Sequence, residues 1–445
     1  MRIAIVGNFG LGGKQTMAVR ALPIAQALVK RGHAVQMALP VRCREDRDGH
    51  REIEGVQIRL ADPKLRVGGL SHLWQLMQLA RYCWEWRPEA LYCFKPIAYS
   101  GAILALFRGL RRLRLYHGLI ALDTDDWEGK GGWSERFSIP RWLKGFIAAQ
   151  ESWCLRHADV VTVASLELAE LIKSTGRAET IYLPNAISAS SPGLLASTGK
   201  NLHSILADEQ TSPGSASGPF TLTGDGQASP GSAGGSLAPL GDRRPIVLLY
   251  TRFVEFGVKR VLDVLEQILA RRGDALLLVV GRGLEGEDEE LRKAAADRGI
   301  DQSLHLAGWV PSRELPDYFA AADVAIYPMD DTLLNRSKCP MKMLDLLAAG
   351  VPVVADSVGQ ACEYISDGRT GVLVNPDSPQ MMAEAVVSLL EDRSLRQVLS
   401  ENARKDVQAR WSWDRWAPVV ENALTSYPTT RSGSPPAPIQ TPDPR

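Results

Sequence analysis

The feature that most constrains the fold of this sequence is an alternation of short apolar runs with amphipathic stretches. In the first half of the chain the apolar runs are RIAIVG, HAVQMAL, EALYCF, LRLYHGLIALD, ADVVTVAS and TIYLPN. In the second half they are PIVLLY, ALLLVVG, SLHLAGW, VAIYP, VPVVAD and GVLV. Strands that alternate with helices over short connections are typical of a parallel, doubly wound sheet. The sequence therefore predicts an α/β fold with two Rossmann-like domains.

Composition divides the chain further. The stretch 188–244 is rich in Ser, Gly, Ala and Pro, so it cannot bury enough apolar surface to offset the entropy lost on ordering. We expect an N-terminal domain at 1–187, a disordered insertion at 188–244 and a C-terminal domain at 245–410. A helix at about 411–427 is expected to pack back on the N-terminal domain, and 428–445 to be a disordered tail. Because open α/β sheets bind ligands beyond the carboxyl ends of their strands, we expect the active site in a cleft between the two sheets.

Charge and cysteine usage exclude several classes of protein. The 445 residues carry a formal net charge of zero, whereas nucleic-acid binders usually show a basic excess. Six cysteines are scattered without a C-x-x-C pair, which argues for a reducing compartment and against a zinc site. The first residues indicate a strand instead of a secretion leader, and no apolar run approaches the roughly 18 residues of a spanning helix. We expect a cytoplasmic protein, free or at the inner face of a membrane, that binds no nucleic acid.

A glycine-rich loop follows the first strand, in the sequence GNFGLGGK. Such a loop before a helix usually approaches a phosphate. A P-loop is disfavoured because Asn8 and Gln15 stand where it needs Gly and Ser or Thr. The dinucleotide fingerprint fails as well, since its last glycine would fall on Gln15. Gly12 and Gly13 therefore indicate a close approach of backbone to ligand without naming the ligand.

Two cations follow the strand 245–250, in TRFVEFGVKR. Arg252 and Lys259 flank the loop that connects this strand to the next helix. A guanidinium and an ammonium placed there could clamp a diphosphate. The alternative is a solvated surface pair, which is the usual state of Arg and Lys.

A second candidate anion site lies in KCPMKMLD. Pro340 is suited to the first turn of a helix, so the free N–H groups near Met341 would have Lys338 and Lys342 beside them. Asp345, one turn further on, could accept hydrogen bonds from a ribose. A carboxylate among leucines usually has a partner, although a solvated helix residue is the alternative.

In this order the motifs resemble those of GT-B glycosyltransferases, in particular glycosyltransferase family 4. The matching stretches are the Arg252–Lys259 loop, LLLVVGRG, LAGWVPSRELPDYFAAADVAIYP, LLAAGVPVVA and SVGQACEYISDGRTGVLVNP, with IAQALVKRGHAV, ADVVTVASLELAELI and YLPNAI in the first half. The resemblance covers the chain except the insertion and the tail. It implies that Gly12, Gly13 and Val310 contact the donor.

The resemblance also implies a reaction. It is the transfer of a sugar from a nucleoside-diphosphate sugar to a glycan, a lipid-linked or a small-molecule acceptor, with retention and without a metal or other cofactor. The leaving diphosphate would take the proton of the acceptor, and Arg252 and Lys259 would stabilise its charge. The family often carries two glutamates eight positions apart, which here fall on Ser337 and Asp345. This departure puts the identity of the sugar in doubt more than nucleotide binding.

Acidic residues gather in DTDDWEG at 123–129. The D-x-D pattern could hold a metal, but it is short and frequent by chance, so we expect no metal. We expect Asp125, Asp126 and Glu128 on a cleft loop, in contact with sugar or acceptor hydroxyls. His117 could orient an acceptor hydroxyl if it lies at a strand end near the cleft. A buried, hydrogen-bonded histidine is the alternative.

The segment 97–116 joins an apolar run to four arginines, which could rest on an anionic membrane and suit a lipid-linked acceptor. An ordinary core helix with a solvated basic end explains the segment too. Two functional alternatives also remain. One is a GT-B-like subunit that lost catalysis and serves as a scaffold, and the other is a nucleotide-sugar epimerase.

Overall fold

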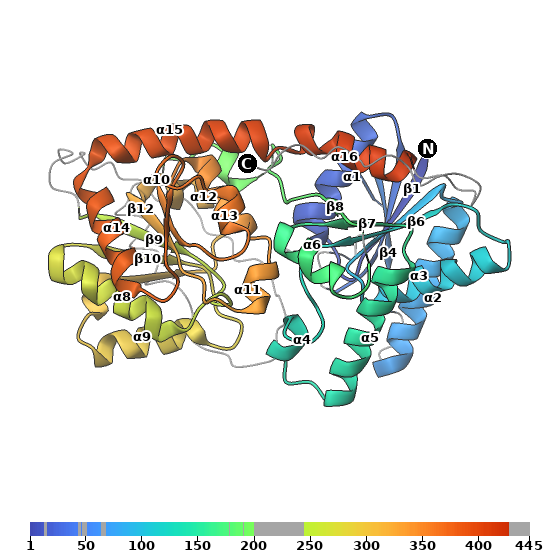
Figure 1. The fold of residues 1–445 in the computed structure, drawn as a ribbon, viewed down its shortest axis with the longest axis horizontal. Coiled ribbons are helices and arrows are strands. Elements are labelled where there is room, and N and C mark those ends of the chain that lie inside the picture. The colour runs from blue at the N-terminus through green and yellow to red at the C-terminus, as the bar shows by residue number, and fades with distance from the viewer. Residues whose placement is uncertain are drawn as a thin grey trace, which may run out of the picture. The chain divides into compact units, whose positions relative to one another are not determined.

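The structure is a computed structural model that describes residues 1–12, 16–42, 46, 51–63, 68–177, 179–189, 191–199 and 244–426 (Figure 1). The chain divides into two compact units. Unit 1 comprises Met1–Ser188, Asp331–Met341 and Gln408–Arg445, and unit 2 comprises Ala189–Asp330 and Lys342–Val407. Each unit is built on a largely parallel sheet with helices beside it, which confirms the predicted fold class.

In the described part of unit 1, eight strands form one sheet in the order β3-β4-β2-β1-β5-β6-β7-β8. The strands are β1 (Arg2–Val6), β2 (Ala34–Pro40), β3 (Arg51–Ile53), β4 (Val56–Ala61), β5 (Ala90–Phe94), β6 (Leu119–Thr124), β7 (Val160–Val163) and β8 (Ile181–Tyr182). The helices are η1 (Met17–Ala21), α1 (Leu22–Lys30), α2 (Gly68–Trp86), α3 (Ala98–Arg112), α4 (Trp133–Arg136), α5 (Arg141–His157), α6 (Leu166–Lys173), α11 (Leu333–Ser337) and α16 (Trp413–Thr425).

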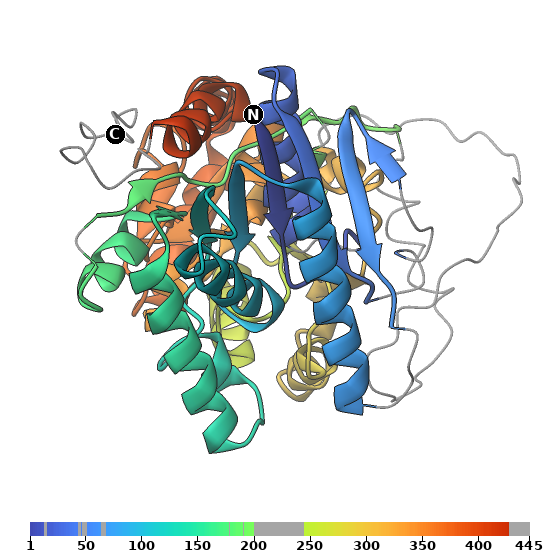
Figure 2. The ribbon, with the colours of Figure 1, turned by 90° about the vertical axis from the view of Figure 1, so that its right-hand side faces the viewer.

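Helices cover both faces of this sheet. The helices α1 and α16 pack together on one face, while α2, α3 and α5 lie on the other (Figures 1 and 2). The central strands β1, β5 and β6 are fully buried along most of their length, as expected for a parallel sheet with two covered faces. Since β1, β5 and β6 are parallel neighbours, the residues that follow them meet at one edge. This carboxyl edge positions the first candidate site.

The sequence did not reveal β3 and β4. They form an antiparallel hairpin whose turn holds Glu54 and Gly55, both at positive φ. Two neighbouring residues at positive φ are typical of the tight turns that match the twist of a hairpin. The short strands alternate polar and apolar residues, so they present no apolar run.

In the described part of unit 2, six strands form a parallel sheet in the order β11-β10-β9-β12-β13-β14. The strands are β9 (Ile246–Tyr250), β10 (Leu276–Val280), β11 (Leu304–Gly308), β12 (Val324–Tyr327), β13 (Val353–Asp356) and β14 (Val372–Val374). The helices are η3 (Pro192–Leu194), α8 (Val258–Arg271), α9 (Glu287–Asp297), η5 (Asp301–Ser303), α10 (Leu315–Ala321), α12 (Met341–Ala349), α13 (Ala361–Tyr364), α14 (Pro379–Glu391) and α15 (Arg393–Arg410).

The core of unit 2 lies where α8 and α14 pack on the sheet. Along α8 the buried residues Val258, Val261, Leu262, Leu265 and Ile268 recur at helical spacing, so one face of the helix meets the strands. This packing fixes the first turn of α8 beside the carboxyl end of β9, which is the second candidate site.

Two segments do not lie where the predicted boundaries put them. Residues Asp331–Met341 belong to unit 1, although they fall within the predicted C-terminal domain. Residues 191–199 of the predicted disordered insertion are ordered on α10, because the Asp317 carboxylate accepts hydrogen bonds from Ser197, Thr198 and Gly199. The helix α16 contacts α1, and its Glu421 bonds His33, just beyond the end of α1, at 2.8 Å. The rest of the predicted insertion, apart from 188–189 and 244, and the tail 428–445 lie outside the described residues.

No helix within the described ranges combines the length and the hydrophobicity needed to cross a bilayer.

Candidate functional sites in the two units

The carboxyl edge of unit 1 holds a buried cluster of one lysine and three carboxylates. Lys95 directly follows β5, and its Nζ lies 3.1 Å from Asp125, 2.9 Å from Asp126 and 2.7 Å from Glu128. Thr16 donates its hydroxyl to the other oxygen of Asp125 at 2.8 Å. The structure thus brings together the three acids expected from the sequence, and adds a lysine that the sequence analysis missed. A lysine after a strand carries no pattern that separates it from a surface lysine.

Burial and charge act in opposite directions on this cluster. Burial alone would lower the pKa of Lys95, but the surrounding carboxylates raise it well above its usual value. Burial raises the pKa of Asp126 and of Glu128, and the attraction of Lys95 offsets only part of that rise. For Asp125, Lys95 and Arg20 outweigh burial, so its pKa is lowered. One ammonium shared by three acids leaves Asp126 and Glu128 as the acids most easily protonated.

A fourth acid supports the loop that carries this cluster. Glu151 of α5 is buried, and its Oε1 accepts the backbone N–H of Glu128 at 2.9 Å. Its Oε2 faces Gly129, where an added Cβ would come within 2.6 Å of that oxygen. Burial raises the pKa of Glu151 to about 8, although the backbone N–H groups of Glu128 and Gly129 oppose the rise. Glu151 therefore positions the acidic loop without reaching the cluster through its own side chain.

A buried ion pair lies at the same edge of the sheet, next to the acidic cluster. Arg20 of η1 is fully buried and binds both carboxylate oxygens of Asp123 at 2.7 Å. Its other contacts are Asn185 at 3.0 Å and the carbonyl of Leu183 at 2.8 Å. Asp123 and Asp125, the two acids of the D-x-D pattern, are thus each bonded to a cation of the chain. That no metal is required remains a prediction.

The glycine loop meets a carboxylate of the chain itself. The N–H groups of Leu11 and Gly12 donate to Oδ1 of Asp46 at 3.1 and 3.2 Å. A donor phosphate that used the N–H of Gly12 would have to replace Asp46. Gly13, the other glycine expected to approach the donor, lies outside the described residues. Asn8, which broke the P-loop pattern, accepts the N–H of Ser100 at the start of α3.

The anion site expected around Met341 is divided between the units. Lys338 and Met341 belong to unit 1, whereas Lys342 and Asp345 belong to unit 2. The ammonium of Lys338 lies 5.3 Å from the ring of Trp133, within reach of a cation–π attraction. Its positive charge also opposes the rise in the pKa of Asp126, although this effect is smaller than those of burial and of Lys95. Lys338 therefore belongs with the acidic cluster.

The position of His117 corrects its expected placement. It precedes β6 and is exposed, whereas the acidic cluster follows that strand. A strand of this length spans about 20 Å, so His117 lies at the opposite edge of the sheet. The apolar run LRLYHGLIALD misled the prediction, because the strand begins only at Leu119.

The basic segment 97–116 is largely α3, and its apolar face is core. Ile103, Leu104 and Phe107 are buried, and Arg111 pairs with Asp159 at 2.5 and 2.7 Å. Arg108 also reaches Asp159, at 3.4 Å. These contacts match the core-helix alternative for α3 itself, while Leu113 and Leu115 beyond its end are exposed.

The second candidate site gathers around Tyr250, at the carboxyl end of β9 in unit 2. The ammonium of Lys342 lies 5.5 Å from the Tyr250 ring. Burial first, and then the negative charge of Asp345, raise the pKa of Tyr250 well above its usual value, while the charge of Arg252 opposes them. Arg252 is exposed, and Asp345 is buried one turn into α12. Two cations and a carboxylate thus lie around the end of one strand.

The first turn of α8 presents its two cations differently. The side chain of Lys259 is 81% exposed and pairs with Asp263 at 2.9 Å. Arg260 points inward, to Asp356 at 2.7 Å and Asp330 at 3.0 Å. Burial raises the pKa of Asp356 to about 6, against the attraction of Arg260 and the N–H of Met329. Arg260 therefore fixes the loops of this edge, while Lys259 faces solvent.

Val310, expected at the donor site, follows β11 at the same carboxyl edge and is buried. Its neighbour Trp309 is 68% exposed. A large exposed aromatic at this edge could stack on a nucleobase. Trp309 ends the apolar run SLHLAGW, which predicts a strand residue, whereas the strand ends at Gly308 and Trp309 is exposed.

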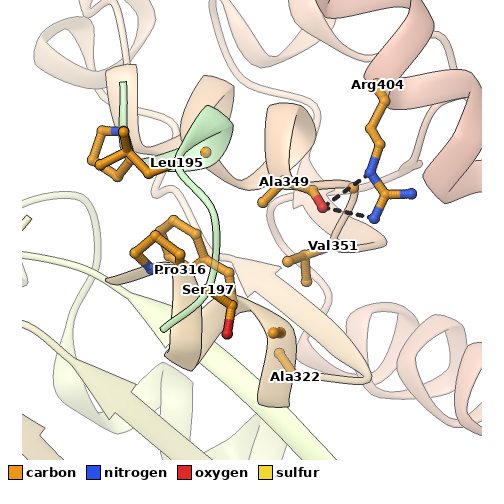
Figure 3. Close-up of a pocket in the computed structure, with 12 residues that line it drawn as sticks. Leu195, Ser197, Pro316, Ala322, Ala349, Val351 and Arg404 are labelled. Atoms are coloured by element: carbon orange, nitrogen blue, oxygen red, sulfur yellow. Dashed lines mark hydrogen bonds between the residues drawn. The ribbon is translucent and has the colours of Figure 1, made fainter. Parts of the chain in front are cut away.

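A cavity of about 290 Å³ lies at the opposite edge of unit 2 (Figure 3). It is lined by Leu195, Pro316, Ala322 and Val351, with Arg404 at its side. Arg404 donates to the carbonyl of Ala349 at 2.9 Å through Nη2. Since Ala322 and Val351 precede β12 and β13, this cavity is at the amino edge of the sheet and is separate from the residues around Tyr250.

Two family models match the chain. Residues 15–186 match the glycosyl transferase 4-like domain, and residues 244–392 match glycosyl transferases group 1. The first stretch covers most of unit 1, and the second holds all six described strands of the unit 2 sheet.

Curated relatives and solved structures agree with these matches. The chain is 33% identical to the GDP-mannose-dependent alpha-(1-6)-phosphatidylinositol monomannoside mannosyltransferase of Mycobacterium tuberculosis, over 42% of this chain and 48% of that protein. The match therefore spans about half the length of that relative. Sucrose-phosphate synthase from Thermosynechococcus elongatus has a TM-score of 0.67 at 17% identity, covering 95% of this chain and 98% of that one. HepE from Anabaena, in complex with UDP-glucose, has a TM-score of 0.62 at 16% identity, covering 96% and 100%. The chain belongs to the GT-B glycosyltransferases of the group 1, family 4 type.

Proposed function

We propose that this protein transfers a sugar from a nucleoside-diphosphate sugar to a glycan or lipid-linked acceptor. The observation that carries the proposal is the set around Tyr250, where Arg252, Lys342 and Asp345 surround the carboxyl end of one strand. Cations at that position suit a diphosphate, and the carboxylate of Asp345, one turn into α12, suits ribose hydroxyls. The solved relative HepE binds UDP-glucose, which supports a donor of this class.

The reaction needs a stabilised leaving group. The bond between the sugar C1 and the diphosphate oxygen breaks, the acceptor oxygen bonds to C1 on the same face, and the acceptor proton passes to the leaving diphosphate. Arg252 and Lys342 would hold the negative charge that develops on that diphosphate. Lys259 would join them after leaving Asp263, since an exposed pair four residues apart on a helix is worth only about 0.3–0.5 kcal/mol. Retention and independence from metal remain parts of the proposal.

The acidic cluster of unit 1 would bind the acceptor. Asp126 and Glu128 present carboxylate oxygens, which suit the hydroxyl groups of a sugar or of an inositol. The curated relative named above acts on a phosphatidylinositol mannoside, which supports a lipid-linked acceptor. The scaffold and epimerase alternatives are not favoured, because the matching families are glycosyl transferases.

Thermal unfolding with a panel of nucleotides and nucleotide sugars, in the presence of EDTA, tests the donor. A ligand at 100 times its Kd adds about 2.7 kcal/mol to the free energy of unfolding. We expect a shift for one nucleoside diphosphate and its sugar, and its loss in Arg252→Ala. The matched control is Arg271→Ala, because Arg271 ends α8, the helix that follows the Arg252 loop, at the other edge of the sheet. No shift with any nucleotide, or a shift that survives Arg252→Ala, would refute the assignment. The anomeric configuration of the product then tests retention.

A further inference from the structure

The first half of α5 projects from unit 1 and carries exposed aromatic side chains. Trp142 is 73% exposed and Phe146 is 58% exposed. They are four residues apart, so they lie on one face of the helix. None of residues 141–150, all of which the structure describes, is buried, whereas Glu151, Cys154 and Leu155 further along are. In both ribbon views α5 reaches the outer margin of its unit (Figures 1 and 2).

Positive charge surrounds these aromatic residues. The stretch 129–147 contains Lys130, Arg136, Arg141 and Lys144 but only one acid, Glu135, which pairs with Lys144 at 3.0 Å. Arg141 is exposed beside Trp142. Exposed aromatic residues combined with excess cations are the composition of segments that rest in the headgroup region of an anionic bilayer.

We propose that the α5 surface, formed by Phe137, Arg141, Trp142 and Phe146, docks on an anionic lipid bilayer. A second copy of the chain fits this surface less well. A two-fold interface would bring its excess cations against each other, whereas an anionic bilayer neutralises them. Segment 97–116 is a weaker candidate, because two of its arginines are engaged by Asp159.

A short series of contacts links the α5 surface to the acidic loop. Phe137 stacks on Trp133, with ring centroids 6.3 Å apart. The backbone N–H of Trp133 donates to the backbone carbonyl of Trp127, and Glu128 follows Trp127 in the loop. Docking through α5 would therefore hold this loop near the headgroups, where a lipid-linked acceptor presents its sugar. That consequence rests on the proposed function, but docking itself does not.

Vesicle co-sedimentation of the full chain tests the proposal. The probe is phosphatidylcholine vesicles that contain phosphatidylglycerol, compared with vesicles of phosphatidylcholine alone. We expect binding to the anionic vesicles only, reduced by added salt. Trp142→Ser with Phe146→Ser should lower the partition coefficient at least about tenfold, since two aromatic side chains no longer insert. Arg141→Glu should lower it by about fivefold or more, from the lost attraction alone.

The matched control is Leu113→Ser with Leu115→Ser. These leucines are also exposed, but they follow α3 at the opposite edge of the sheet and belong to segment 97–116. The control should bind vesicles like the unchanged protein. If it loses binding while the α5 variant keeps it, the docking surface is segment 97–116 and the proposal is wrong. Equal binding to uncharged vesicles, or no binding by the unchanged protein, overturns it as well.

Sedimentation velocity tests the other possible partner of the α5 surface, which is a second copy of the chain. A dimer that dissociates in the Trp142→Ser, Phe146→Ser variant would identify the α5 surface as a contact between two copies, which would refute bilayer docking. Vesicle binding and donor binding are measured independently. A protein that binds vesicles but no nucleotide would refute the proposed function and leave the docking surface intact, and the reverse result would do the opposite.

Discussion

Replacing Glu151 with glutamine removes a buried carboxyl group that accepts a backbone hydrogen bond from the acidic loop of unit 1. Glutamine keeps the acceptor for the N–H of Glu128 and has nearly the same shape, but it stays neutral at every pH. The pKa of Glu151 is raised by burial to about 8, whereas an unfolded glutamate titrates near 4.3. Between these two pKa values, the folded protein therefore retains a proton on Glu151 that the unfolded chain releases.

This difference in pKa decides whether the protein gains or loses stability as the pH rises. A group whose pKa is raised on folding stabilises the protein fully below its unfolded pKa, and the stabilisation is lost as the pH rises toward its folded pKa. Each pH unit in this window costs about 1.4 kcal/mol, and the loss levels off near the folded pKa. From pH 6 to pH 8 the contribution of Glu151 to the free energy of unfolding therefore falls by about 2 kcal/mol.

Urea unfolding followed by tryptophan fluorescence at pH 6 and pH 8 measures this loss. Between these two pH values the Glu151→Gln variant should lose about 2 kcal/mol less than the unchanged protein. Glu167→Gln, at an exposed glutamate of α6, is the control and should show the full pH dependence. If Glu151→Gln and the unchanged protein lose stability in parallel, Glu151 does not hold a proton in this range and the argument from burial fails.

Four further predictions address the two sites and the loop on α10. Arg20→Met leaves Asp123 buried and unpaired, so it should lower the free energy of unfolding by about 3–5 kcal/mol in urea titration; a loss below about 1 kcal/mol would contradict the buried pair. Lys259→Ala should cut turnover at least about 100-fold with an unchanged thermal transition, whereas Lys293→Ala on α9 should not change turnover; unchanged kinetics in Lys259→Ala would remove Lys259 from the site. Trp309→Ala should weaken donor binding by calorimetry about tenfold if the ring stacks on the base, and unaltered affinity would exclude stacking. Asp317→Ala should expose residues 191–199 to limited proteolysis, while Asp301→Ala on η5 should not; equal resistance in both variants would show that Asp317 does not hold the segment.

The sequence predicted the fold well because the signal for buried parallel strands is local. In unit 2 each predicted apolar run contains a strand, as in 275–281 for β10 and 324–328 for β12. A strand covered on both faces must be apolar along its whole length, so its own residues reveal it. The β3–β4 hairpin escaped because its short strands alternate polar and apolar residues, whereas the prediction rested on continuous apolar runs.

The placement of the site residues also depended on whether the local sequence fixes the element that carries them. The sequence placed Arg252 just after a strand and Asp345 one turn into a helix, and both act on the pKa of Tyr250, while their roles in donor binding remain predictions. His117 was misplaced because the sequence gives a strand without fixing which residue begins it. Lys338 was paired with Lys342 by proximity in sequence, but the chain passes between units at that point.

What the sequence determined by itself is the order of strands and helices, since periodicity and turn residues act over a few positions. The tertiary structure alone decided which charges meet. Arg20 sits in an amphipathic stretch that suggests a solvated arginine, yet it is fully buried against Asp123, which lies 103 residues away. Lys95 and Glu151 likewise contact the acidic loop from distant parts of the chain. A charged side chain is tolerated inside a protein only when its partner arrives from elsewhere in the chain, and no local pattern records that partner.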